Sequence, residues 1–146
     1  GGIDPAVGME AARRAVQVTG ELPPPGSPLV VQLEATVNIA AGPVPWGLGP
    51  WLPTADLVRV DGDPAVATEL VERTGERPLV IVVRDAHRHP GQRALVSALL
   101  AGRPDAVVVE MGLPVWRPDS AAFIATYGAA YANGRAAAEL LGLTPR

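Results

Sequence analysis

Short runs of hydrophobic residues recur along the chain, and four of them are typical of buried strands. Each run is four or five residues long, is rich in Val, Leu and Ile, and contains at most one polar residue. The four runs cover residues 29–33, 57–60, 79–83 and 106–109, and a weaker fifth run covers 123–126. Such runs indicate strands covered on both faces, as in a parallel sheet between two layers of helices.

Helical patterns lie between these runs, over about residues 5–19, 63–74, 90–101 and 134–141. Polar residues that could cap the helices stand at their starts: Asp4, Asp63, His89 and Asn133. Glycines stand where a helix end would need a left-handed residue: Gly20, Gly75, Gly102 and Gly142. The alternation predicts an α/β fold, a three-layer αβα sandwich with a mostly parallel five- or six-stranded, flavodoxin-like sheet and one extra N-terminal helix.

The chain of 146 residues has the length of one domain. A proline-rich stretch at 22–28 separates the first helix from the first strand, which divides the chain into a helix and linker (1–27) and a sandwich domain (28–146). Since a helix and linker ahead of a sandwich are unusual for a free-standing domain, we expect a piece of a longer chain.

Composition excludes several classes of protein. With 48% hydrophobic and 18% charged residues the chain is globular, and no apolar run approaches the roughly 20 residues of a membrane span. A net charge of −3 and few aromatic residues argue against nucleic acid as a partner. The chain has no cysteine, and all twelve basic residues are arginine. The absence of a signal segment predicts a cytoplasmic location, with secretion of a longer parent left open.

Two long loops follow strands at the carboxyl edge of the predicted sheet, where open α/β sheets bind ligands. The loops cover 36–54 and 111–118 and contain all three tryptophans, Trp46, Trp51 and Trp116. Each tryptophan either packs its loop onto the sheet or contributes to an aromatic platform for sugar rings.

The segment R-D-A-H-R-H-P (84–90) leaves the third strand at the same edge. In extended backbone Asp85, His87 and His89 would share one face and could bind a metal ion. Alternatively, Asp85 pairs with a nearby arginine while His89 caps the next helix. In the third reading the segment, including Arg84, is a polar surface that faces a ligand or a partner domain.

Other chemistry finds little support. A phosphate-binding P-loop needs a lysine, which the chain lacks. Asp85 stands where a two-component phosphoacceptor aspartate would, but only Glu34 offers part of the usual acidic pair. Asp85 and Glu110 end neighbouring strands and are outside candidates for a glycosidase carboxylate pair. We expect no metal and no cofactor.

Most of the chain resembles the carboxy-terminal α/β sandwich domain of family-three glycoside hydrolases, and is most similar to the actinobacterial, β-N-acetylhexosaminidase-like type. The motifs that carry the resemblance are RDAHRHPGQRALV (84–96), RPDAVVVEMGLP (103–114), ATYGA (125–129) and NGRAAAELLG (133–142). AARRAV (11–16) and GPVPWGLG (42–49) fit the same domain.

The resemblance implies that catalysis belongs to another domain. In that family the nucleophilic aspartate lies in an amino-terminal (β/α) barrel, and this branch draws its acid/base from a His–Asp dyad on a barrel loop. Neither motif occurs here, so no catalytic residue is carried over.

We therefore expect a non-catalytic domain, inactive alone, that packs on a catalytic barrel of the same parent chain and walls its sugar cleft. The residues expected at that edge are Trp46, Arg84, Asp85, His87, His89 and Trp116. The alternative is a free-standing module that binds carbohydrate or protein through the tryptophan loops. An exposed apolar patch would favour a homodimer of the isolated domain.

Overall fold

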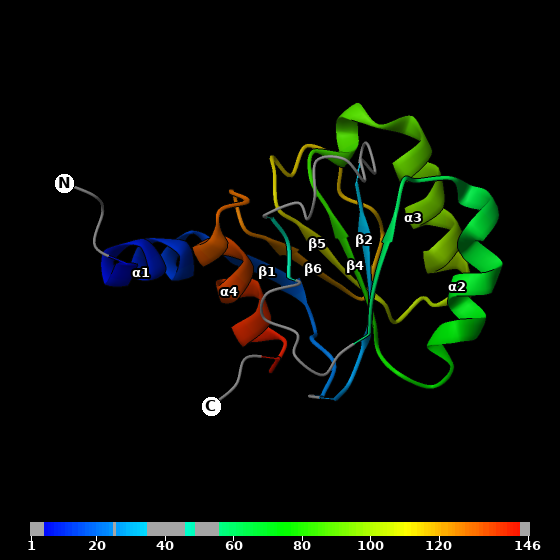
Figure 1. Ribbon diagram of the computed structural model, residues 1–146, viewed down its shortest axis with the longest axis horizontal. Coiled ribbons are helices and arrows are strands. Elements are labelled where there is room, and N and C mark those ends of the chain that lie inside the picture. The colour runs from blue at the N-terminus through cyan, green and yellow to red at the C-terminus, as the bar shows by residue number, and fades with distance from the viewer. Residues whose placement is uncertain (1–4, 25, 35–45, 49–55, 144–146) are drawn as a thin grey trace.

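A six-stranded sheet forms the centre of the molecule, in the strand order β1-β6-β5-β4-β2-β3 (Figure 1). The computed structural model describes residues 5–24, 26–34, 46–48 and 56–143. The strands are β1 (Gln17–Gly20), β2 (Leu29–Leu33), β3 (Asp56–Val60), β4 (Leu79–Val83), β5 (Val107–Glu110) and β6 (Ala122–Ala125). Within those residues no helix is both long and apolar enough to cross a membrane.

Strands β2 to β6 are parallel and confirm the predicted fold class. Counted from β2, their order across the sheet is 2-1-3-4-5, the flavodoxin-like order. The strand order reverses between β2 and β4, so the carboxyl ends of these two strands flank the position where such sheets commonly bind ligands.

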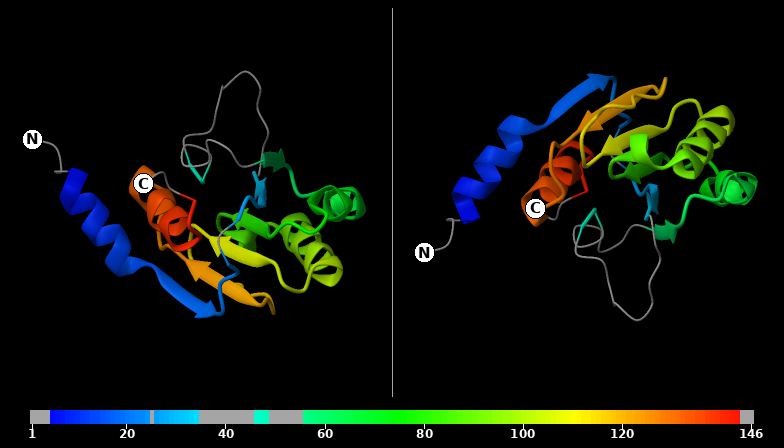
Figure 2. Two further views of the ribbon diagram at one scale, coloured as in Figure 1. Left: turned by 90° about the horizontal axis from the view of Figure 1, so that it is seen from below. Right: turned by 90° about the horizontal axis from the view of Figure 1, so that it is seen from above.

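Helices cover both faces of the sheet (Figure 2). One face packs against α2 (Ala67–Thr74) and α3 (Pro90–Gly102), and the other against α4 (Tyr131–Leu140). Alternate residues of β4 enter the two cores, since Leu79, Ile81 and Val83 lie on the α3 side and Val80 and Val82 on the α4 side. Four of the six strands are buried along their whole length, which explains their continuous apolar runs.

The predicted strands agree with the structure to within one residue. The runs 29–33 and 79–83 coincide with β2 and β4, whereas β3 starts one residue earlier than its run and β5 and β6 are shifted by one.

The predicted caps fare differently. Asp63 is confirmed, because its Oδ1 accepts a hydrogen bond from Ala65 N at 2.9 Å before the 3-10 turn η3 (Pro64–Val66). His89 does precede α3, but its side chain makes no capping hydrogen bond. Asn133 is wrong as a cap, since α4 begins at Tyr131 and Asn133 Oδ1 reaches back to accept from Ala130 N at 3.0 Å. Asp4 is outside the described residues.

Of the glycines predicted to end helices, Gly75 and Gly142 have positive φ at the ends of α2 and α4. The prediction for Gly102 is wrong, because this residue is the last one of α3 and has no positive φ. A Cβ at Gly102 would lie 2.9 Å from Val71 Cγ2, so this position needs glycine for close packing of α3 on α2.

The predicted helix 5–19 is also wrong at its end. α1 (Pro5–Ala15) stops before β1, which pairs antiparallel with β6. All four residues of β1 are exposed, so no alternation of hydrophobic and polar residues marks this strand in the sequence. α1 runs on into β1 along the outside of the molecule (Figure 2), and Arg13 joins it to α4 through a two-point hydrogen bond to Glu139 at 2.8 and 3.0 Å. The division of the chain at residues 27 and 28 stays a prediction.

Replacement of Gly20 tests this edge strand. Gly20 has φ = 83°, and a Cβ there would lie 2.1 Å from the Ala121 carbonyl oxygen. We expect Gly20→Ala to cost at least about 1–3 kcal/mol through backbone strain and to remove hydrogen-exchange protection of residues 17–20. Gly75→Ala is the matched control, because its φ is 59° but no atom lies within 4 Å of the added Cβ. Unchanged β1 protection in Gly20→Ala would contradict the assigned pairing.

Candidate functional site

The carboxyl edge of the sheet is organised by one buried carboxylate, that of Glu110 at the end of β5. Glu110 Oε2 accepts from Asp85 N at 2.8 Å and from Gly112 N at 2.9 Å, and Oε1 accepts from Ala86 N at 3.1 Å. The side chain is fully buried. This carboxylate accepts three backbone N–H groups and thereby joins the loops after β4 and β5, which is the geometry of a structural residue.

Asp85 completes this junction. Its backbone is left-handed, at φ 55° and ψ 47°, which is uncommon for a residue other than glycine. Its Oδ1 accepts from Leu113 N at 2.8 Å. A Cβ at Gly112 would lie 2.1 Å from that Oδ1, so only glycine fits between the two loops. The Asp85 carboxylate thus binds backbone, and it forms no ion pair with any arginine that the structure describes.

The hydrogen bonds continue to β6 and α4. Thr126 N donates to the Glu110 carbonyl at 3.1 Å, and Thr126 Oγ1 donates to the Gly128 carbonyl at 2.7 Å. Tyr127, like Asp85, has a positive φ, at 58°, and its hydroxyl donates to Gln17 Oε1 at 3.0 Å. A connected network of hydrogen bonds therefore joins the ends of β4, β5 and β6.

The segment R-D-A-H-R-H-P is not extended. Residues Ala86–Arg88 form the 3-10 turn η4, so Asp85, His87 and His89 do not share one face as strand residues would. Within the described part of the chain no group of three His, Cys, Asp or Glu could hold a metal ion. His87 Nδ1 is buried without a hydrogen-bond partner among the described residues, and Arg93 Nη1 instead holds the turn through the carbonyls of Ala86 and His87.

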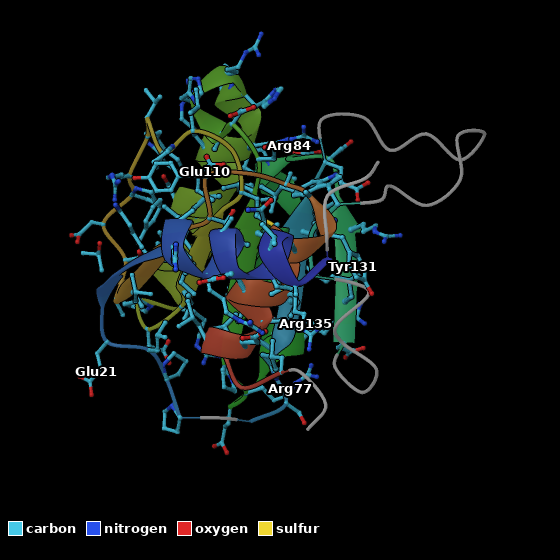
Figure 3. All side chains as sticks on the ribbon, turned by 90° about the vertical axis from the view of Figure 1, so that its left-hand side faces the viewer. Glu21, Arg77, Arg84, Glu110, Tyr131 and Arg135 are labelled. Atoms are coloured by element: carbon cyan, nitrogen blue, oxygen red, sulfur yellow. The ribbon has the colours of Figure 1, made fainter. Side chains whose placement is uncertain are left out.

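Arg84 and Glu110 lie at one end of the sheet, and Arg77 lies at the opposite end (Figure 3). Arg84 and Arg88 are exposed, whereas His87 and His89 are half-buried. The structure thus brings the predicted polar residues to one edge, and the prediction that they face another domain stays a prediction.

The described tryptophans do not form a common platform. Trp46 is 8% exposed and belongs to the core on the α4 side. Trp116 is half-buried and packs against the core on the α3 side. The sheet separates the two rings, and each packs against the core on its own face. Trp51 is outside the described residues.

Gln32 is a structural residue that sequence reasoning missed. Its side chain is fully buried and clamps 46–48 onto the sheet: Nε2 donates to the Trp46 carbonyl at 3.3 Å and Oε1 accepts from Leu48 N at 3.4 Å. Gln32 Nε2 also donates to Glu34 Oε1 at 3.2 Å, and Arg59 Nε lies 3.2 Å from the same oxygen. A polar residue inside an apolar strand was the available signal.

Among the residues that the structure describes, three carboxylates have a pKa below the ordinary value, and all three belong to surface ion pairs away from this network. The hydrogen bond from Arg77 lowers the pKa of Asp56, and Arg103 and Arg13 do the same for Asp105 and Glu139. Their contribution to stability is present above the pKa of an unfolded carboxyl group and is lost as the pH falls through the lowered pKa.

Comparisons with known proteins identify the fold. No family model matches the chain, and no curated protein matches it by sequence. The fold is similar to part of a glycoside hydrolase family 3 β-N-acetylglucosaminidase from Paenibacillus sp. str. FPU-7, with a TM-score of 0.68 and 22% identity. The match covers 94% of this chain and 30% of that chain. The predicted resemblance to one domain of a family-three glycoside hydrolase is confirmed at the level of fold.

Glu110→Gln tests the junction. The substitution places an amide –NH2 group among three N–H donors, so at least one buried donor loses its acceptor. We expect a loss of about 3 kcal/mol in the free energy of unfolding, measured with urea. Glu76→Gln, at an exposed residue whose side chain has no hydrogen bond or ion pair in the described structure, is the control. A loss below about 0.5 kcal/mol in Glu110→Gln would reject the structural role.

Proposed function

We propose that the chain is a non-catalytic, carboxy-terminal domain of a glycoside hydrolase of the β-N-acetylglucosaminidase or β-glucosidase kind. The observation that carries the proposal is the fold match, which takes in 94% of this chain but 30% of the family 3 enzyme. In this proposal the remaining part of the parent contains a catalytic (β/α) barrel, on which the domain packs.

The carboxyl edge is the surface that we assign to the barrel. Trp46, Arg84, Asp85, His87, His89 and Trp116 lie in or support the loops of that edge. A rigid wall suits a cleft, because ordering it on binding costs little conformational entropy. Its role in the proposal is to shape the sugar cleft and to exclude water, while the acid/base and nucleophile come from the barrel.

The engagement of the edge carboxylates supports a non-catalytic role. Both oxygens of Glu110 accept backbone hydrogen bonds, and one oxygen of Asp85 does so as well. A general acid needs access to the glycosidic oxygen.

We also propose a cytoplasmic location, which rests only on the sequence.

An activity assay tests the proposal. The purified 146-residue chain should not hydrolyse an aryl β-N-acetylglucosaminide or an aryl β-glucoside. A longer polypeptide that includes the coding sequence upstream of Gly1 should hydrolyse one of them. Turnover by the 146-residue chain, or an upstream sequence that encodes no barrel, would refute the proposal. Saturable binding of N-acetylglucosamine by the chain alone, measured by tryptophan fluorescence, would favour a carbohydrate-binding module instead.

A further inference from the structure

The carboxylates at the carboxyl edge of the sheet are bound within the protein. Glu34, Asp85 and Glu110 stand at or just after the ends of β2, β4 and β5. Glu110 is fully buried, and Asp85 Oδ1 accepts from Leu113 N at 2.8 Å. Glu34 is 5% exposed, and its Oε1 lies 3.2 Å from Arg59 Nε. The negative charges of these three strand ends are therefore engaged inside the edge.

Two arginines of the same edge are exposed. Arg84 follows β4 directly, at the end of the sheet that also holds Glu110 (Figure 3), and Arg88 is the last residue of η4. Neither side chain forms a hydrogen bond or an ion pair with a residue that the structure describes. Exposed acids, Asp61 and Asp63, follow β3. In a chain of net charge −3, the ends of β4 and β5 thus present local positive charge.

Exposed aliphatic side chains accompany the two arginines. Leu113 is 61% and Val115 is 67% exposed, the highest values among the large hydrophobic residues that the structure describes. The hydrogen bond from Leu113 N to Asp85 Oδ1 ties their loop to the turn between the arginines. We name Arg84, Arg88, Leu113 and Val115 the basic edge. Arginine and exposed apolar side chains together are typical of a surface that binds protein.

The size of the parent favours a tethered domain as the partner of the basic edge. The match to the family 3 enzyme covers 30% of that chain, and the proposed function places a barrel in the remaining part. A domain on the same chain is present at a high effective concentration, so a small contact is enough to hold it. A free protein partner needs a specific interface of about 1,000 Å² or more.

We propose that the barrel surface opposite the basic edge is acidic and that its carboxylates pair with Arg84 and Arg88. This inference rests on the proposed function and gives the chemistry of its domain contact. A guanidinium that is covered without a partner loses its hydration at a large cost in free energy, so the covering domain has to supply acceptors. Leu113 and Val115 pack against apolar side chains of the same barrel surface.

Arginine labelling with phenylglyoxal, read by mass spectrometry, tests the contact. The two samples are the 146-residue chain and a longer chain that includes the coding sequence upstream of Gly1. Arg84 and Arg88 should be labelled at least about tenfold more slowly in the longer chain, because labelling then requires the domains to separate. This protection should decrease at 1 M salt, where the Debye length is about 3 Å. Arg73, 48% exposed in the last turn of α2, is the control and should be labelled equally in both.

The variant Arg84→Glu/Arg88→Glu of the longer chain tests the charge of the barrel surface. Hydroxyl radicals should oxidise Leu113 and Val115 slowly in the unmodified longer chain. In the variant the oxidation should rise to the rate of the 146-residue chain, since like charges then face each other. Arg84→Lys/Arg88→Lys keeps both charges and should keep both aliphatic residues protected. Urea unfolding of the same variants in the 146-residue chain controls for the fold.

Equal labelling of Arg84 and Arg88 in the two chains overturns the inference, as does protection of Leu113 and Val115 that survives charge reversal. Protection that appears only with an added aryl β-glucuronide assigns the arginines to an anionic substrate and overturns it too. So does protection of the 146-residue chain that grows with its concentration, which assigns them to a second copy. These results leave the proposed function standing, whereas an upstream sequence that encodes no barrel refutes the proposed function itself.

Discussion

The carboxyl edge of this protein depends on one buried charge. Glu110 ends a fully apolar strand, and its carboxylate accepts three backbone N–H groups from the loops after β4 and β5. A buried carboxylate is tolerated only when such donors compensate for its lost hydration. The donors in turn are backbone groups that would otherwise be buried without partners. Each side of the interaction therefore requires the other, which makes the junction a cooperative unit.

This junction determines how the loops at the carboxyl edge are presented. It holds Asp85 in a left-handed conformation and places Leu113 beside the turn that bears Arg84 and Arg88. Arg84 and Arg88 form no ion pair among the described residues, and Leu113 and Val115 are exposed, which is the composition of a binding surface. The same geometry explains why an acid at this edge serves architecture in the proposal, while the chemistry belongs to another domain.

The candidate site could be located from the sequence, but its internal geometry could not. Strand ends in a parallel sheet share an edge, so the motif after β4 and the loop after β5 were expected together. The alternation of Asp85, His87 and His89 suggested a shared face, but the 3-10 turn at Ala86–Arg88 rotates them apart. That turn is stabilised by Glu110, which lies on another strand and cannot be paired with it by spacing.

The sequence by itself determined the parallel strands, most of the helices and the class of the fold. A strand that is buried on both faces needs apolar residues at successive positions, and such runs can be recognised in the sequence. Only the tertiary structure decided the rest. β1 pairs through its backbone while all its side chains stay exposed, so no side-chain pattern marks it. Trp46 and Trp116 lie on opposite faces of the sheet because different contacts hold them, Gln32 for Trp46 and the α3-side core for Trp116. The local hydrophobic pattern indicates which residues are buried. It does not indicate which residues distant in the sequence they contact, because those contacts form only when the chain folds.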